Sequence, residues 1–207
     1  MKISHSIKLF LLYLLLIAPL SAVAAENAGS LVDRISQKMK SMKSAEVVFT
    51  ISSHQGHENG RMTLGGNAFV IETPSLSTWY DGTTQWSYAK SQREVTITNP
   101  TNAEISEVNP LLILNSIKQH YTPTLVKGSK TAKVIKLTAR QKNSPIATAV
   151  LTVNSSSLYP QSILLTLSNR QTISIKISSI KSGNALPRSK FQFNKRLYPG
   201  VEIIDLR

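Results

Sequence analysis

Residues 161–180, QSILLTLSNRQTISIKISSI, contain two runs in which apolar and polar side chains alternate. The apolar members of the two runs are Ile163, Leu165, Leu167, Ile173, Ile175 and Ile177. Alternation with a period of two is the pattern of a β-strand that buries one face. The turn residues Asn169 and Arg170 between the runs favour an antiparallel hairpin. This stretch therefore predicts an antiparallel sheet with one apolar and one wet face.

The rest of the chain continues this pattern in both directions. Further short β segments are predicted over residues 47–51, 61–64, 68–72, 77–80, 84–88, 94–98, 133–140 and 146–153. Gly65-Gly66, Pro74 and Asp81-Gly82 supply turn residues between them, and residues 54–60 are predicted to form a polar turn. We expect a single, mainly β domain with an antiparallel sheet of about ten strands, which should curl because one face is apolar.

Two helices are expected beside the sheet. Residues 30–43 place apolar side chains at helical spacing, and Ser30 with Asp33 forms a capping signature. Residues 109–120 form a second, shorter and more apolar segment with Pro110 in its first turn. A helix that apolar must be covered, so we expect both helices to act as lids over the concave apolar face of the sheet.

Residues 1–25 are predicted to be a cleaved signal peptide, followed by one domain over residues 26–207. Lys2 and Lys8 precede an unbroken apolar run over residues 9–17, and small residues follow Pro19. A retained N-terminal anchor is the alternative, but the run is short for a membrane span. The signal predicts export to the periplasm, with the extracellular space as the second choice. Because the chain contains no Cys, we expect neither disulfides, nor thiol catalysis, nor lipidation near the cleavage site.

Positive charge is concentrated in the second part of the chain. Residues 26–120 contain 8 basic and 9 acidic residues, whereas residues 121–207 contain 14 basic and 2 acidic residues. This part could present a positive surface to anionic headgroups or to an acidic protein, or its Lys and Arg could simply solvate the outer faces of strands. Both Trp lie outside the basic part, so no nucleic-acid stacking surface is expected.

The sequence carries no recognisable catalytic or cofactor motif. It lacks a G-x-S-x-G elbow, a Walker A loop and a G-x-G-x-x-G sequence. His54 and His57 beside Glu58 could hold a metal, but an exposed polar turn explains them better, and His120 suits a helix C-terminus. A hydrolase would need a Ser–His–acid cluster that the pattern does not supply. We therefore expect no enzyme activity, no metal and no cofactor.

Apolar side chains of the predicted strands and of the second helix are the candidate ligand-binding residues. They are either the lining of a hydrophobic concavity or an ordinary core between sheet and helices. The candidates are Phe49, Ile51, Met62, Leu64, Phe69, Ile71, Trp79, Trp86, Leu111, Leu112, Leu114, Ile163, Leu165 and Ile175.

Several motifs in order resemble the outer-membrane lipoprotein carrier protein family (LolA type). The first is residues 69–88, FVIETPSLSTWYDGTTQWSY, which match the family's aromatic strand, Pro, Trp and D-G-x-T-x-W-x-Y segment. Asn109-Pro110 before an apolar helix, and the ending KFQF…PGVEII over residues 190–204, match further family features. The similarity extends over nearly the whole chain after the signal.

The resemblance implies an unclosed β half-barrel whose mouth is covered by helices, enclosing a hydrophobic cavity for lipoprotein acyl chains. It implies a soluble, monomeric periplasmic chaperone that receives acylated lipoproteins from an inner-membrane ABC-type release complex. An outer-membrane acceptor is implied without being identified, and nucleic acid is not among the partners. Well-studied members place an Arg before the strand's Pro, where it bonds to the lid, whereas this chain has Thr73. The alternative function is a periplasmic lipid-sensing or envelope-stress module that acts through protein–protein contact.

Overall fold

The computed structural model describes residues 27–101, 104–105, 117 and 119–207. The predicted signal peptide and the candidate residues Leu111, Leu112 and Leu114 lie outside these residues, as does most of the predicted second helix. The signal and the second helix therefore remain predictions. In the described part of the chain, no helix is long and apolar enough to cross a membrane.

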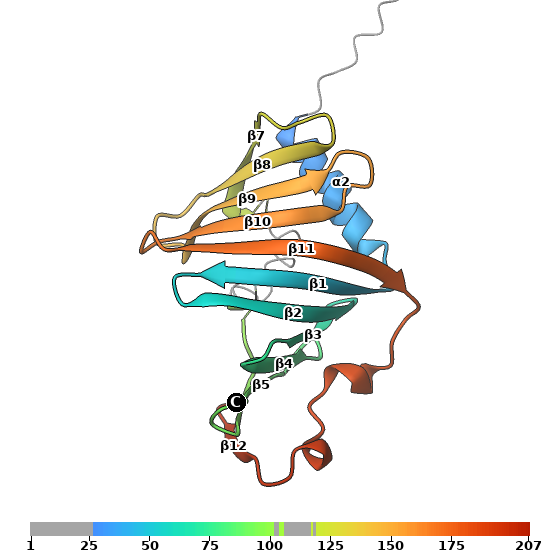
Figure 1. The fold of residues 1–207 in the computed structure, drawn as a ribbon, viewed down its shortest axis with the longest axis vertical. Coiled ribbons are helices and arrows are strands. Elements are labelled where there is room, and N and C mark those ends of the chain that lie inside the picture. Colours follow the sequence, from blue (N-terminus) through green and yellow to red (C-terminus); the bar gives the residue numbers. More distant parts are fainter. Residues whose placement is uncertain (1–26, 102–103, 106–116, 118) are drawn as a thin grey trace, which may run out of the picture.

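One sheet of twelve strands organises the molecule (Figure 1). Its order is β12-β6-β5-β4-β3-β2-β1-β11-β10-β9-β8-β7, so the N-terminal strand β1 lies beside β11. β7 and β12 are the two edges and are not paired with each other, so the sheet of the described residues is not closed into a barrel. The strands are β1 (Ser44–Ser53), β2 (Gly56–Gly65), β3 (Ala68–Glu72), β4 (Leu76–Tyr80), β5 (Gln85–Ala89), β6 (Glu94–Thr98), β7 (Tyr121–Val126), β8 (Ala132–Ala139), β9 (Ile146–Asn154), β10 (Pro160–Leu167), β11 (Thr172–Gly183) and β12 (Glu202–Asp205).

The ten predicted strands are confirmed, and the structure adds two. β7 contains Pro123 and has exposed residues at its end, so it lacks the alternation by which the others were found. β12 has four residues and pairs in parallel with β6, which makes the sheet mixed and not purely antiparallel. The expected turn over residues 54–60 is also shorter, because β2 begins at Gly56 and pairs His57 with Ser52.

Helix α2 (Ala28–Lys40) packs at the β7 end of the sheet. Its buried residues are Ala28, Leu31, Val32 and Ile35, and it lies behind β8–β11 in the view of Figure 1. The predicted Ser30 cap is wrong: the helix begins earlier, and Asn27 Oδ1 accepts a hydrogen bond of 2.8 Å from the Ser30 N–H. The expectation that two helices cover the concave face is not confirmed, because α2 is the one α-helix whose bounds fall within the described residues.

The two faces of the sheet carry different clusters. We call the face toward α2 the inner face; it carries the larger apolar cluster, which includes Val47, Phe49, Phe69, Ile135 and Leu151. The opposite, outer face carries a smaller cluster around Val70, Trp79 and Phe191. After β11, residues 184–201 run beside β3–β5 with two short 3₁₀ helices, η1 (Arg188–Phe191) and η2 (Lys195–Leu197), before β12 (Figure 1). We call residues 184–201 the C-terminal segment.

Candidate binding face of the sheet

The inner face brings most of the predicted apolar residues together. They lie on five neighbouring or nearby strands and belong to one contiguous cluster. The predicted candidates in it are Phe49, Met62, Phe69, Ile71, Ile163, Leu165 and Ile175, which are buried, and Ile51 and Leu64, which are half-buried. Such a surface can hold apolar ligand atoms by the hydrophobic effect, and these side chains offer no groups for covalent chemistry.

Close approach of an aromatic ring to glycine shapes this face. Phe49 on β1 is paired with Gly60 on β2, and its ring lies over the glycine. A Cβ on Gly60 would lie 2.3 Å from Phe49 Cζ, which is far inside van der Waals contact. Nearby, the Phe69 and Tyr80 rings pack with centroids 5.3 Å apart. The strands can therefore carry large rings on the inner face because a side chain is absent at position 60.

Trp79 and Trp86 do not lie on the inner face. The expectation that they line the same apolar surface as the other candidate residues is therefore wrong. Trp79 is opposite Val70 and Trp86 in the sheet register, one position away from the inward-facing Tyr80. Its ring packs edge-on against Phe193 and Tyr198 at centroid distances of 5.4 and 5.8 Å. Both tryptophans therefore belong to an outer-face aromatic cluster that the C-terminal segment covers.

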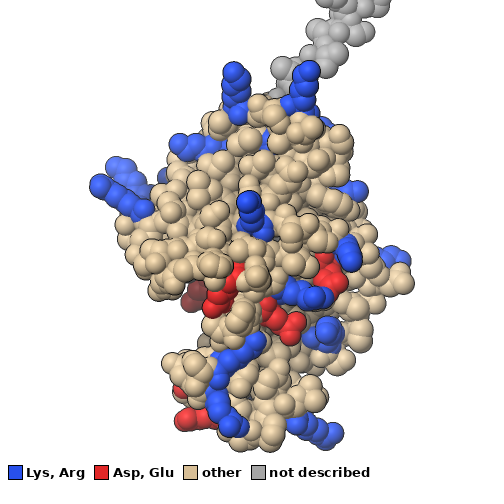
Figure 2. All heavy atoms as spheres, viewed as in Figure 1, with Lys and Arg blue, Asp and Glu red and all other residues tan. Residues whose placement is uncertain are grey.

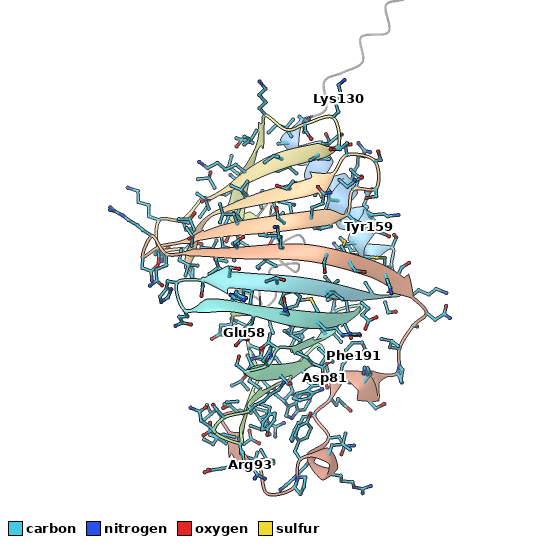
Figure 3. All side chains as sticks on the ribbon, in the orientation of Figure 1. Glu58, Asp81, Arg93, Lys130, Tyr159 and Phe191 are labelled. Carbon is cyan, nitrogen blue, oxygen red and sulfur yellow. The ribbon has the colours of Figure 1, made fainter. Side chains whose placement is uncertain are left out.

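Polar contacts hold the C-terminal segment beside this aromatic cluster (Figure 3). Asp81 Oδ2 accepts hydrogen bonds from Gln192 Nε2 at 3.1 Å and from Arg188 Nη2 at 3.3 Å, while its Oδ1 caps the β4–β5 turn. Arg93 Nη2 donates to the Pro199 carbonyl at 3.0 Å. Burial pushes the pKa of Asp81 upward, but hydrogen bonds from the Thr84 N–H, Gln192, the Thr83 N–H and Arg188 outweigh it, so this pKa lies below its ordinary value.

Thr73, at the position for which the sequence resemblance implies an arginine, has a local role in the turn between β3 and β4. The Leu76 N–H donates to Thr73 Oγ1 at 3.2 Å, and the Thr73 N–H donates to the Leu76 carbonyl at 2.8 Å. Lys90 Nζ also donates to the Thr73 carbonyl. Among the described residues, the hydrogen bonds of Thr73 therefore lie in or beside this turn.

The inner face changes character at its β4–β6 end. Five of the inward positions there carry hydroxyl or amide groups, next to the inward-facing Tyr80, where β1–β3 carry apolar side chains. We call this set the polar strip; it consists of Thr78, Gln85, Ser87, Thr96 and Thr98. Sequence reasoning missed it because short Thr/Ser-rich strands are typical of a solvated face, and only the register places these residues inward.

Basic residues do not gather into one continuous patch on the face that Figure 2 shows. Lys and Arg are scattered over this face, several of them beside the Asp and Glu near its middle, and most of the remaining surface is uncharged. The sheet register also forms a row of threonines across β7–β11, made of Thr122, Thr138, Thr148, Thr166 and Thr172. The basic part of the sequence is thus divided between the β7–β11 end and the C-terminal segment.

Histidine and carboxylate groups do not form a metal site among the described residues. No three His, Asp or Glu side chains gather there. Glu58, beside His57, instead accepts a hydrogen bond from Ser75 Oγ at 2.9 Å. The structure therefore gives no geometric support to the metal alternative at His54 and His57.

Solved structures resemble this fold at low sequence identity. An uncharacterized conserved protein from Thermus thermophilus is 10% identical with a TM-score of 0.58, covering 86% of this chain and 98% of that one. A putative outer membrane lipoprotein-sorting protein domain from Vibrio parahaemolyticus is 10% identical over 81% of this chain and 96% of that one, with a TM-score of 0.46. A chain of the Pseudomonas aeruginosa MucA/MucB complex is 13% identical over 81% of this chain and 61% of that one, with a TM-score of 0.43.

Sequence comparison gives the family. No curated protein matches the chain. A family model described as outer membrane lipoprotein carrier protein LolA matches residues 20–185, which is most of the sequence. This match agrees with the open sheet, the N-terminal helix and the motifs at residues 69–88. The chain belongs to the family of the outer membrane lipoprotein carrier protein LolA.

Proposed function

We propose that this protein is a periplasmic carrier that binds lipoprotein acyl chains on the inner face of its sheet and carries lipoproteins from the inner to the outer membrane. The observation that carries the proposal is the contiguous apolar cluster on the inner face of an open sheet, in a member of this family. An open sheet can separate from its covering elements and expose such a face without losing strand pairing. The proposed action is binding and release, with no catalytic step.

The energetics of acyl chains limit how such a carrier can work. Burial of each CH₂ group contributes about 0.8 kcal/mol, so full burial of three long chains would reach roughly 35 kcal/mol. Non-covalent binding in practice ends near about 20 kcal/mol. A carrier that releases its cargo therefore buries the chains incompletely, or uses part of the binding energy to displace its own covering elements.

The proposed partners follow from this role. We expect acylated lipoproteins as cargo, an inner-membrane ABC-type complex as donor and an outer-membrane acceptor. The donor and the acceptor should contact the carrier outside the inner face, because the cargo itself occupies that face. We expect the carrier to act as a monomer.

Site-specific photocrosslinking tests the acyl-binding face. Ile51 and Thr50 are neighbours on β1, but Ile51 is half-buried in the inner-face cluster whereas Thr50 points outward and bonds Asn59. A benzophenone amino acid at position 51 should crosslink to acyl chains of lipoprotein that co-purifies from the periplasm, and the same group at position 50 should not. Mass spectrometry of the adducts identifies the cargo.

Two results would contradict the carrier proposal. Equal crosslinking at positions 50 and 51 would mean that the inner face does not bind the chains. Crosslinks to a periplasmic protein, with no acylated species at either position, would favour the sensing module that acts through protein–protein contact.

A further inference from the structure

The polar strip contains buried polar atoms without partners among the described residues. Thr78 is 1% exposed, and its Oγ1 has no hydrogen-bond partner in this part of the chain. Gln85 Oε1 is likewise buried and unpartnered there, while Gln85 Nε2 donates to Ser87 Oγ at 3.1 Å. If the amide is turned by 180°, its nitrogen becomes the unpartnered atom, so one end of the Gln85 amide lacks a described partner in either orientation.

These groups lie side by side on the sheet. Thr78 is directly opposite Ser87, and Gln85 is opposite Tyr80, so Thr78 and Gln85 are diagonal neighbours across β4 and β5. Tyr80 packs on Phe69, which places the strip next to the apolar part of the inner face. Buried polar groups without partners destabilise a folded protein, so two of them close together suggest a ligand that supplies the missing bonds.

We propose that the polar strip is a subsite for the amide groups at the acylated N-terminus of a lipoprotein. This inference rests on the proposed carrier function and adds to it a site that recognises the polar end of the cargo. The apolar inner face would hold the chains, while Thr78 and Gln85 hold the amide that joins a chain to the N-terminal cysteine, or the peptide group after it.

The chemistry of the strip selects an uncharged ligand group that both donates and accepts. A threonine hydroxyl can do both, and the free end of the Gln85 amide needs one partner of either kind. An amide supplies an N–H and a C=O a short distance apart, whereas an ester only accepts. Since Thr78, Gln85 and Ser87 are neutral, a charged headgroup would find no countercharge among these three.

Removal of the Thr78 hydroxyl separates ligand recognition from stability. Thr78→Val keeps the shape of the side chain and removes the unpartnered oxygen. We expect the affinity for a synthetic tripalmitoyl-cysteinyl peptide to fall about tenfold, because the loss of one hydrogen bond to the ligand changes the affinity by about this factor. The affinity for N-phenylnaphthylamine, an apolar probe without an amide, should stay unchanged. The melting temperature of the empty protein should rise by about 2–4 °C, because a buried unpartnered group has been removed.

Matched variants make this test specific. Thr78→Ser keeps a hydroxyl and should retain peptide affinity, and Gln85→Leu should lower it as Thr78→Val does. Thr63→Val makes the same change on the outer face of β2, opposite Val70, and should leave both affinities unchanged. If the wild type binds the lipopeptide and Thr78→Val binds it equally well, the subsite is overturned while the carrier function stands. If the wild type does not bind the lipopeptide at all, both proposals fall.

Discussion

Single residues decide how large rings fit on the inner face. The Phe49 ring occupies the space where a side chain at position 60 would stand. Neither residue is unusual in the sequence, since a Gly beside a turn is expected on other grounds. The contact is visible only once the register pairs β1 with β2.

Gly60→Ala should therefore lower the free energy of unfolding by about 1–3 kcal/mol, because the new methyl group forces the Phe49 ring aside. Urea unfolding followed by circular dichroism measures the change. The double variant Phe49→Leu/Gly60→Ala should show less loss than the sum of the two single variants, since the smaller side chain makes room. Additive losses would mean that the two residues do not compete for this space.

Asp81 should make stability depend on pH. Its folded-state pKa lies below the ordinary value, so the carboxylate contributes stability at neutral pH, and that contribution is lost as pH falls below about 4 through the folded-state pKa. Asp81→Asn should lower the free energy of unfolding by about 1–2 kcal/mol at pH 7, and the difference from the wild type should shrink at pH 3. Urea titrations followed by tryptophan fluorescence at both pH values test this, because Trp79 lies under the same segment. A difference that does not vary with pH would contradict the role of the carboxylate.

At the scale of elements, Phe191 is the most deeply buried of the aromatic side chains that hold the C-terminal segment. Phe191 is 3% exposed and fits against Gly65 on β2, where a Cβ would lie 2.4 Å from its ring. The segment also carries Arg188, Lys190, Lys195 and Arg196, which are sites for trypsin. Its attachment can therefore be measured by proteolysis.

Phe191→Ala should speed tryptic cleavage within residues 188–196 by about tenfold or more, because the anchor no longer fills its place on the outer face. Leu197→Ala is the matched control: Leu197 lies in the same segment but is 72% exposed, so its loss should leave the cleavage rate unchanged. Equal acceleration by both variants would mean that the buried Phe191 holds the segment no more strongly than the exposed Leu197 does.

The edge strand β7 illustrates what a sequence pattern cannot decide. The Arg140 N–H donates to the His120 carbonyl, so in the antiparallel ladder the backbone groups of Thr122 and Thr124 face β8. Pro123 then faces the free edge, where its missing N–H removes a donor that another strand could use. Alternation predicted the interior strands well, but an edge strand needs no apolar alternation and was missed.

Pro123→Val should restore an N–H at this edge and promote association between copies of the chain. Light scattering after size-exclusion chromatography should detect dimers or larger species at concentrations where the wild type is monomeric. Thr122→Val is the control, because its backbone already faces β8. A monomeric Pro123→Val protein would show that the edge is protected by other means.

At the scale of the whole molecule, the sequence indicated the sheet, its apolar face and the family, because all three depend on local alternation and ordered motifs. The placement of Trp79 and Trp86 could not be predicted in this way. Strands β3–β5 carry large side chains at successive positions, such as Trp79 and Tyr80, so the pattern does not say which face is inner. The parallel pairing of β12 with β6 and the inward Thr78 depend on contacts between distant segments, which no local pattern encodes.

The division of basic residues between the two ends of the sheet changes what the charge can do. The net charge of +13 is large, but acidic groups lie near the middle of the face in Figure 2. Long-range attraction to an anionic membrane should remain, while tight docking needs the more basic β7–β11 end.

The protein should bind vesicles that contain phosphatidylglycerol in about 20 mM salt and lose most of this binding near about 150 mM. Lys127→Glu/Lys130→Glu, at the β7–β8 connection, should weaken co-sedimentation more than Lys190→Glu/Lys195→Glu in the C-terminal segment. Equal losses in the two double variants would mean that net charge alone governs the attraction, and binding that salt does not weaken would exclude an electrostatic origin.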